Sequence, residues 1–322
     1  PPSRAGPVFA RFAAPRAATR TRVGIVADPH VTPTDTGTWK VFHRTEERLR
    51  TAVDLLNDLG VDATCDLGDL TRDGTDAEFD VVESVLGRLD APWAAVPGNH
   101  DVPKAWDDHE TPAVETFGDR FAAGLPFHRQ AGDVDLIGLD SASGPGLGDT
   151  IEGRLSAADL AWLDQTLEGA DAPVVTLHHN LTRADEHTGE FPEADQYHLR
   201  NDDELAAVLD RHGGALVCSG HIHWPAVGRR GPSRELLAPA TCSFPQAALL
   251  LDVGPTGTTV RFRGVHARGR GQRTRAGHRG VRRRVGGQSD RHGPEERPVA
   301  RVLEGDRLDD ARRLRVVRRR HD

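Results

Sequence analysis

The sequence predicts an α/β sandwich built around a mixed β-sheet, with helices on its faces. Up to residue 167, short apolar runs rich in β-branched residues alternate with amphipathic segments of helical period. From residue 172 on, apolar runs predominate, and the last two, within residues 247–262, are joined by a Gly/Pro turn typical of a β-hairpin. Strands that follow one another in this way argue against a barrel whose strands are all parallel.

Three helices are expected from apolar spacing and from their end signals. The segment 45–60 places five apolar residues at helical spacing and ends in Gly60, a frequent helix stop. The segment 75–89 is a second amphipathic helix. Ser156 caps the third, which runs to about residue 167, and Asp159 at its third position comes close to a capping box.

The predicted strands are short, apolar and bounded by turn residues. The first covers residues 23–28, with the sequence VGIVAD. In the run 91–101 a strand passes into a loop. The other strands are expected at residues 61–69, 134–142, 172–180, 215–223 and 236–241, followed by the hairpin.

Charge divides the chain into two parts. Residues 261–322 hold 20 arginines and 8 acidic residues, a net of +12, whereas the remaining residues hold 21 basic and 41 acidic side chains, a net of −20. An acidic body disfavours a nucleic-acid groove spread over its surface, so a nucleic-acid partner is not expected. Residues 264–322 contain no Phe, Tyr, Trp or Ile, which predicts a disordered tail. A basic nucleic-acid arm and a frame error in translation are the alternatives for this tail.

The ends of the chain and its cysteines suggest a cytoplasmic protein. Residues 1–21 hold four arginines, no acid and no signal-peptide apolar region, so they are expected to form a flexible lead. No run approaches the roughly 18 apolar residues of a membrane span, and no membrane partner is expected. Cys65, Cys218 and Cys242 lie in or beside apolar runs, as buried thiols in a reducing compartment would. The oligomeric state is open.

Residue types that bind metals follow five of the predicted strands. The motifs are VADPH with Asp28 and His30, LGDL with Asp69, PGNHD with Asn99 and His100, LHHN with His178 and His179, and SGHIH with His221 and His223. Each motif alone is common, and a lone histidine is more often a core or surface residue. In α/β sheets, however, ligands gather beyond the carboxyl ends of the strands. Glycines at positions 68, 98 and 220 allow the sharp turns that five such loops need.

In this order the five motifs resemble the calcineurin-like metallophosphoesterase superfamily. The resemblance spans about residues 22–262, and PGNHD, LHHN and the segment LSAADLAWLDQTL at 155–167 are most similar to the cyclic-nucleotide phosphodiesterase-like branch of bacteria and archaea. It implies a four-layer sandwich of mixed sheets flanked by helices, with the active site at the carboxyl ends of the strands. The catalytic domain would cover residues 22–263.

The resemblance also implies a role for each motif residue. Two divalent ions are expected, the first on Asp28, His30 and His223, the second on Asn99, His178 and His221, with Asp69 bridging both. Oxygen donors mixed with imidazoles suit Mn²⁺, iron or Zn²⁺ better than Ca²⁺. The mechanism hypothesis is attack on phosphorus by a bridging hydroxide, since two cations lower the pKa of bound water toward neutrality.

Three assignments around these ligands remain open in the sequence. His100 would face the phosphate and protonate the leaving oxygen, or it only closes the loop. Asp101 would orient His100, or it is a turn acid. In the His178–His179 pair the first is expected to be the ligand, with the reverse as the alternative.

The expected substrate is a small phosphate ester such as a cyclic nucleotide, as a diester or a monoester. Arg72 and Asp101 stand where the protein-phosphatase branch has other residues, which argues against a Ser/Thr protein phosphatase. A non-catalytic metal-binding scaffold and a nuclease are the competing hypotheses. Trp39 and several loop histidines have two interpretations: they line the site where the substrate enters, or they lie on the solvated surface.

Overall fold

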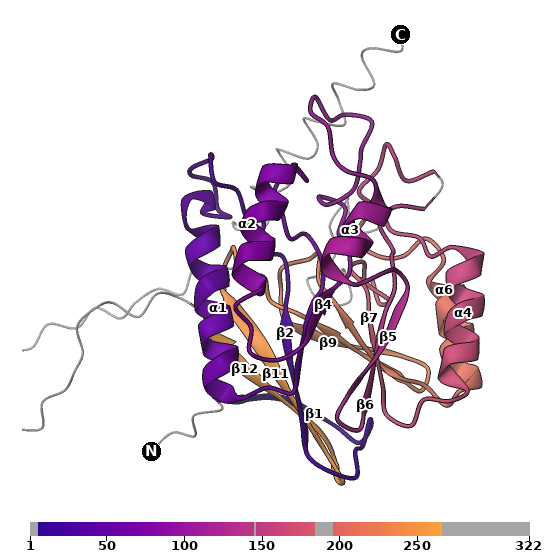
Figure 1. Ribbon diagram of the computed structural model, residues 1–322. Coiled ribbons are helices and arrows are strands. Elements are labelled where there is room, and N and C mark those ends of the chain that lie inside the picture. Colours follow the sequence, from indigo (N-terminus) through magenta and orange to yellow (C-terminus); the bar gives the residue numbers. More distant parts are fainter. Residues whose placement is uncertain (1–5, 145, 184–195, 266–322) are drawn as a thin grey trace, which may run out of the picture. The chain divides into compact units, whose positions relative to one another are not determined.

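Two six-stranded mixed sheets pack face to face in the computed structural model, which describes residues 6–144, 146–183 and 196–265 (Figure 1). The first sheet has the spatial order β1 (Val8–Phe12), β12 (Gly257–Gly264), β11 (Ala247–Gly254), β2 (Thr21–Val26), β3 (Ala63–Asp66), β4 (Trp93–Ala95). The second has the order β5 (Phe127–Ala131), β6 (Val134–Gly138), β7 (Pro173–Thr176), β8 (Leu216–Ser219), β10 (Ser233–Leu237), β9 (Ala226–Arg230). The mixed sheets that the sequence predicts are thereby confirmed.

Helices cover the outer face of each sheet. On the first sheet these are α1 (Thr45–Leu59), which follows the 3₁₀ turn η1 (Phe42–Arg44), α2 (Asp76–Leu86) and α3 (Val114–Phe121). On the second they are α4 (Ala157–Leu167) and α6 (Asp202–Arg211). Figure 1 shows α1 and α2 at one side of the molecule and α4 and α6 at the other. The result is the four-layer order helix, sheet, sheet, helix.

Three hydrophobic cores hold these layers together. Side chains along β2 alternate between two of these cores. Val23 and Ile25 point into the core between the sheets, and Val26 points toward α1 and α2. Gly24 lies on the helix side, where an added Cβ would come within 2.8 Å of Leu56 Cδ2. Its missing side chain therefore lets α1 pack directly on the strand.

Parallel pairing brings the motif loops to one edge. β2, β3 and β4 pair in parallel, and so do β6, β7, β8 and β10. Backbone hydrogen bonds link the loops beyond these strands, from Asp28 N to Gly68 O at 3.0 Å and from Gly220 N to the His178 carbonyl at 3.0 Å. The bond from Thr241 N to Ala27 O, 3.0 Å, joins the edges of the two sheets.

The structure corrects some sequence-based boundaries. Residues 1–21 are not a flexible lead throughout, because Val8–Phe12 is an antiparallel edge strand on β12 and Phe12 is buried in the core between the sheets. Its pairing partner lies about 250 residues further along the chain, which no local pattern reveals. The strand expected at 236–241 is β10, which ends at Leu237. Elements α3, α6, β5 and β9 are additions to the predicted set.

The helix ends and the hairpin agree with the sequence analysis. The Ser156 side chain accepts a hydrogen bond from Asp159 N, and Gly60 is left-handed at the end of α1. β11 and β12 form the predicted hairpin. Most of the predicted tail, from residue 266 on, lies outside the described residues. Within the described part of the chain, none of the helices has the length and apolar character needed to span a bilayer.

Candidate metal centre

Five of the predicted ligands have a left-handed backbone conformation, which is uncommon outside glycine. They are Asp28 (φ 49°), His30 (φ 43°), Asp69 (φ 53°), His221 (φ 71°) and His223 (φ 60°). Each lies just beyond a strand end, where the loop bends back over the sheet. Such conformations cost on the order of 1–3 kcal/mol each and cluster at functional sites. These conformations therefore lower the stability of the fold, and they turn the five side chains toward one place.

Glycines beside the ligands let the loops approach. An added Cβ on Gly98 would lie 2.1 Å from Asp69 Oδ1, and one on Gly68, whose φ is +93°, would lie 2.6 Å from Gly98 N. At Gly220 it would lie 2.8 Å from Asp28 Oδ2. The sequence-based expectation of sharp, crowded turns at these three glycines agrees with this geometry.

The first group of ligand atoms contains Asp28, His30, Asp69 and His223, all buried. His30 Nε2 lies 3.3 Å from Asp69 Oδ2 and 3.2 Å from His223 Nε2. His223 Nε2 lies 3.4 Å from Asp28 Oδ1. Four side chains from three separate strand ends thus direct their donor atoms at one another.

The second group contains Asp69, His178 and His221. His178 Nε2 lies 3.4 Å from Asp69 Oδ1 and 3.0 Å from His221 Nδ1. Asp69 therefore belongs to both groups, with one carboxylate oxygen in each. Asn99 follows Gly98 in the loop packed on Asp69, and its Oδ1 is buried without a hydrogen-bond partner.

Hydrogen bonds behind the rings fix which nitrogen faces each group. His178 Nδ1 donates to Leu67 O over 2.8 Å, which leaves Nε2 as the electron-pair donor. His223 Nδ1 lies 3.0 Å from Ser243 Oγ, so its Nε2 faces the first group. Such outer contacts orient imidazoles in metal sites.

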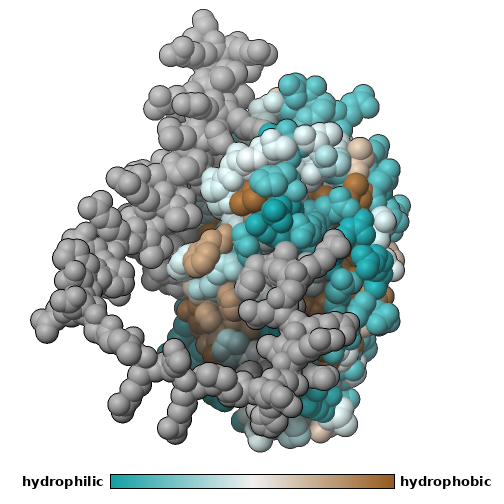
Figure 2. Space-filling model, turned by 90° about the vertical axis from the view of Figure 1, so that its left-hand side faces the viewer, coloured by the Kyte–Doolittle hydropathy of each residue, from teal (hydrophilic) through white to brown (hydrophobic). Residues whose placement is uncertain are grey.

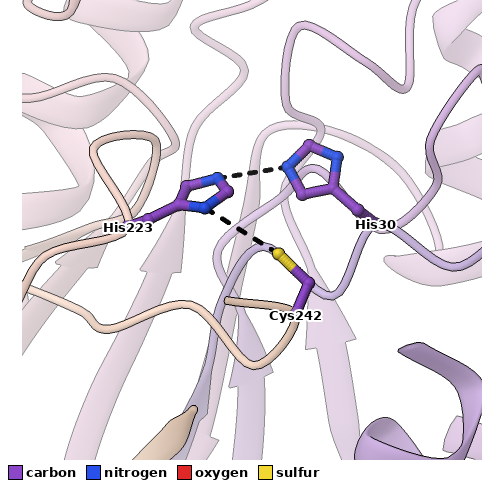
Figure 3. A group of neighbouring side chains, drawn as sticks. All are labelled: His30, His223 and Cys242. Atoms are coloured by element: carbon purple, nitrogen blue, oxygen red, sulfur yellow. Dashed lines mark hydrogen bonds between the residues drawn. The ribbon is translucent and has the colours of Figure 1, made fainter. Parts of the chain in front are cut away.

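Cys242 is a neighbour of this centre that sequence reasoning missed (Figure 3). Its buried Sγ lies 3.8 Å from His223 Nδ1, while His223 Nε2 lies 3.2 Å from His30. Figure 3 shows the two contacts on different edges of the His223 ring. An imidazole that binds through Nε2 thus meets Cys242 with its other nitrogen. The residue follows a predicted strand but carries no motif, so the sequence gives no signal for it.

His178 and His179 point in different directions. Both nitrogens of the His179 ring are engaged, Nδ1 with Ser141 Oγ and Nε2 with Ile151 O, each at 2.9 Å. Burial lowers the pKa of His179 well below the usual value, which keeps it neutral. Of the two, His178 belongs to a ligand group and His179 does not, so His178 remains the proposed ligand.

His100 lies at the edge of the first group. Its ring packs edge-on against His30 with centroids 4.6 Å apart, and its backbone N–H donates to Asp69 Oδ1 at 3.0 Å. The ring Nδ1 lies 2.6 Å from Arg72 O, and since a carbonyl only accepts, Nδ1 holds a proton. Proton exchange at this imidazole therefore occurs at Nε2.

Asp101 organises the loop through backbone hydrogen bonds. Its carboxylate accepts hydrogen bonds from the backbone N–H groups of Leu70 and Gly98, each at 3.0 Å, and of Thr71, at 2.9 Å. These bonds tie the loop after β3 to the loop after β4. The turn-acid interpretation fits this geometry.

The electrostatics of the two groups suit a bound cation. Burial raises the pKa of Asp28 to about 8 and lowers the pKa values of His30 and His221 well below normal, so the imidazoles are neutral donors. Burial also opposes ionisation of Asp69, but the neighbouring His178 holds the pKa of Asp69 well below normal. Burial lowers the pKa of His178, but its contacts with Asp69 outweigh this and raise that pKa to about 9, so a cation that binds at His178 Nε2 would displace a proton from that nitrogen. Buried carboxylates and facing nitrogen lone pairs are costly unless a cation balances them. This donor set, with the orphaned Asn99 Oδ1, therefore fits divalent metal ions.

Comparison with known proteins agrees with the fold and the motifs. A probable cyclic nucleotide phosphodiesterase of Synechococcus sp. is 31% identical over 176 residues, which is 54% of this chain and 62% of the relative. A protein of Nostoc sp. named 3′,5′-cyclic-nucleotide phosphodiesterase is 31% identical over 178 residues, or 54% and 60%. The match thus spans about three-fifths of the length of these relatives.

Solved structures show the same architecture. A dimetal phosphatase of Danio rerio superposes with a TM-score of 0.60 at 15% identity, over 76% of this chain and 96% of that one. At this identity the likeness concerns the fold alone. The family model described as calcineurin-like phosphoesterase matches residues 21–225, which contain all seven predicted ligands. The chain therefore belongs to the calcineurin-like phosphoesterase family.

Proposed function

We propose that this chain hydrolyses phosphodiesters with two divalent metal ions. The observation that carries the proposal is the pair of buried ligand groups that share Asp69. The residues of the first group would hold one ion, and Asp69, Asn99, His178 and His221 the other. Membership of a phosphoesterase family supports hydrolysis, and the names of the two cyanobacterial relatives support a diester.

When bound, the metal ions would polarise the phosphoryl oxygens and acidify a water molecule. The chain's own residues complete the reaction. Asp69 places one carboxylate oxygen in each ligand group, and its Oδ1 also accepts the hydrogen bond of the His100 backbone N–H. His100 Nε2 donates a proton to the leaving oxygen, because Nδ1 is committed to Arg72 O. The mixed oxygen and imidazole donors favour Mn²⁺, iron or Zn²⁺.

Residues 22–263 form the proposed catalytic unit, supported at the sheet edge by β1. A small ester fits this unit better than duplex nucleic acid, because the body carries a net charge of −20. A non-catalytic scaffold would be expected to lack some ligands, whereas all seven positions and His100 are present.

The test compares bis-p-nitrophenyl phosphate with p-nitrophenyl phosphate, in Mn²⁺ and after EDTA treatment. We expect turnover of the diester, its loss in EDTA and its recovery on adding metal. Turnover of neither ester with Mn²⁺, Fe²⁺ or Zn²⁺ would leave only the scaffold hypothesis.

Adjacent histidines provide a matched pair of variants. His178→Asn removes a donor that faces Asp69, whereas His179→Asn changes an equally buried ring held by Ser141 and Ile151. We expect His178→Asn to lower both metal content and turnover. His179→Asn should lower thermal stability and keep two ions per chain, as measured by elemental analysis. The reverse pattern would exchange the two roles.

A further inference from the structure

The loop between β2 and α1 places Trp39 and Lys40 beside the first ligand group. The Trp39 ring centroid lies 5.2 Å from that of His223, at an interplanar angle of 48°. Lys40 Nζ lies 5.4 Å from the Trp39 ring centroid. The indole is half-buried, while Lys40 is only 9% exposed. An aromatic ring and an ammonium group therefore lie together beside the proposed metal centre.

Trp39 does not belong to any of the three hydrophobic cores found among the described residues. A tryptophan whose role is packing would be expected to contact one of them. Its ring lies instead beside His223, a proposed metal ligand. The space-filling view (Figure 2) shows that exposed hydrophobic colour is interrupted by hydrophilic residues on the side it presents. The Trp39 ring therefore lies beside a proposed metal ligand and outside these cores.

Local hydrogen bonds and left-handed residues shape the backbone of this loop. Thr38 and Val41 have positive φ values of 54° and 51°, and Val41 N donates to Thr38 O at 3.1 Å. Lys40 N lies 3.2 Å from Thr38 Oγ1. Two left-handed non-glycine residues flank the Trp39–Lys40 pair, a strained arrangement of the kind that collects at functional sites.

Arg72 connects this loop to His100. Its guanidinium lies 5.0 Å from the Phe42 ring centroid and forms an ion pair with Asp35, both in the loop. Its carbonyl oxygen faces His100 Nδ1 at 2.6 Å. Arg72 thus contacts both the loop that carries Trp39 and Lys40 and the residue proposed to protonate the leaving group.

Lys40 brings positive charge to the centre. Burial is the main cause that lowers the pKa values of His30 and His223, and the positive charge of Lys40 is the second. The same charge lowers the pKa of Asp28. The chain has one other lysine, Lys104, whose Nζ donates to Ala142 O and Leu147 O. An ammonium beside neutral imidazoles would add to the attraction that the proposed metal ions exert on a phosphate anion.

We propose that Trp39 and Lys40 select the substrate: the indole stacks on an aromatic ring attached to the phosphodiester, and the ammonium pairs with a phosphate oxygen. The preferred substrate class is then a nucleotide-like diester, in which a planar base lies within reach of the phosphate. This inference rests on the proposed phosphodiesterase function. Base–aromatic stacking tolerates different bases, so discrimination between adenine and guanine is not expected from Trp39 alone.

The test uses two six-membered cyclic diesters, adenosine 3′,5′-cyclic phosphate and 1,3-propanediol cyclic phosphate, which lacks a base. The measured quantity is the ratio of kcat/KM for the first to kcat/KM for the second. We expect Trp39→Leu to lower this ratio by about 10- to 100-fold, mainly through KM of the nucleotide, since stacking contributes free energy of that order. Trp39→Phe, which keeps a ring, should recover most of the ratio.

Lys40 variants separate charge from stacking. Lys40→Gln should raise KM for both diesters by a similar factor and leave their ratio within about twofold, with partial recovery in Lys40→Arg. Trp162→Leu is the matched control, because Trp162 is a partly buried tryptophan on α4 that packs in the core under the second sheet. It should change neither the ratio nor the metal content.

Binding supplies a readout separate from turnover. Titration of the metal-loaded protein with adenosine 5′-phosphate should quench tryptophan fluorescence in the wild type and much less in Trp39→Leu. Metal content is measured on every variant. A Trp39→Leu protein that loses metal and both activities equally would show a structural role and overturn the proposal.

The outcomes separate this inference from the proposed function. If the wild type hydrolyses neither these diesters nor bis-p-nitrophenyl phosphate with any metal, the phosphodiesterase proposal itself fails. If it hydrolyses bis-p-nitrophenyl phosphate but not the nucleotide diester, the nucleotide-like substrate class is overturned and the phosphodiesterase proposal stands. If it hydrolyses both and Trp39→Leu keeps the wild-type ratio, only the stacking role fails. A fall in the ratio in Phe244→Ala and not in Trp39→Leu would place the base beside Trp224 and Phe244, whose ring centroids are 6.2 Å apart, and would also overturn it.

Discussion

Replacing Asp69 with asparagine isolates the shared carboxylate at nearly constant volume. Asp69 Oδ2 lies 3.3 Å from His30 Nε2, and Oδ1 lies 3.4 Å from His178 Nε2 and accepts the His100 N–H. An asparagine keeps one oxygen, which the His100 N–H retains at the Oδ1 position. The amide nitrogen then replaces Oδ2 and cannot bind a cation. We therefore expect one ion per chain in place of two, lost from the first group.

Loss of one ion removes charge stabilisation of several kcal/mol from the transition state. A loss of about 4 kcal/mol corresponds to a fall of about 1,000-fold in kcat/KM. The assay is bis-p-nitrophenyl phosphate turnover at saturating Mn²⁺, with metal content from elemental analysis of the same sample. Two ions per chain and a kcat/KM within threefold of wild type would refute the shared-carboxylate reasoning.

Asp66→Asn is the control for this experiment. Asp66 is also buried, ends the same strand β3, and accepts from Gly68 N at 3.2 Å, but it belongs to neither ligand group. Burial raises the pKa of Asp66 well above its usual value, which favours the neutral acid, and asparagine is close to isosteric with that form. We expect Asp66→Asn to keep both ions and most of the activity. A loss of both in Asp66→Asn would show that any buried change here disrupts the site.

Further expectations follow from the same contacts. Gly98→Ala should displace Asp69 and lower metal content, because its Cβ would lie 2.1 Å from Asp69 Oδ1, whereas Gly169→Ala, where nothing lies within 4 Å, should be silent in both metal content and melting temperature. Burial lowers the pKa of Lys104 from 10.5 to about 8, so the folded state binds fewer protons than the unfolded state between these values. The free energy of unfolding in urea should therefore rise with pH more in the wild type than in Lys104→Met, by up to about 3 kcal/mol from pH 8 to pH 10.5. A difference between the two proteins that does not change with pH would contradict this. Native protein at pH 8 should leave all three cysteines unreactive toward a thiol reagent until urea is added, since all are buried and burial raises the pKa of the Cys65 thiol to about 12. Deleting residues 1–12 should lower the melting temperature by several degrees, because β1 and buried Phe12 are lost, and an unchanged melting temperature would show that the edge strand contributes nothing.

Local signals in the sequence determined several helix ends and the strands that the motifs follow. Helical spacing with Gly60 placed α1 within one residue of its observed end, and the Ser156 cap placed the start of α4. The donor types were readable because each follows a strand in its own motif, and the arrangement of strand ends in α/β sheets is general. The likeness of the five motifs to a known family then implied which donors share an ion.

Contacts distant in sequence were decided only by the tertiary structure. Phe12 was predicted to lie in a flexible lead. This was wrong because its strand partner is near residue 258, and pairing over that separation leaves no local pattern in the sequence. The same limit applies to the His178–His179 pair, since Ser141 and Ile151 hold the second ring and neither is close in sequence.

The sequence by itself determined which residues offer donor atoms and at which strand ends they lie. It did not determine which atom of each residue points inward, that Asp69 gives one oxygen to each group, or that Cys242, Trp39 and Lys40 lie beside them. Periodicity and turn chemistry act over a few residues, whereas the direction of a side chain at this edge depends on two sheets packing face to face. That packing brings residues 28 and 223 together across most of the domain.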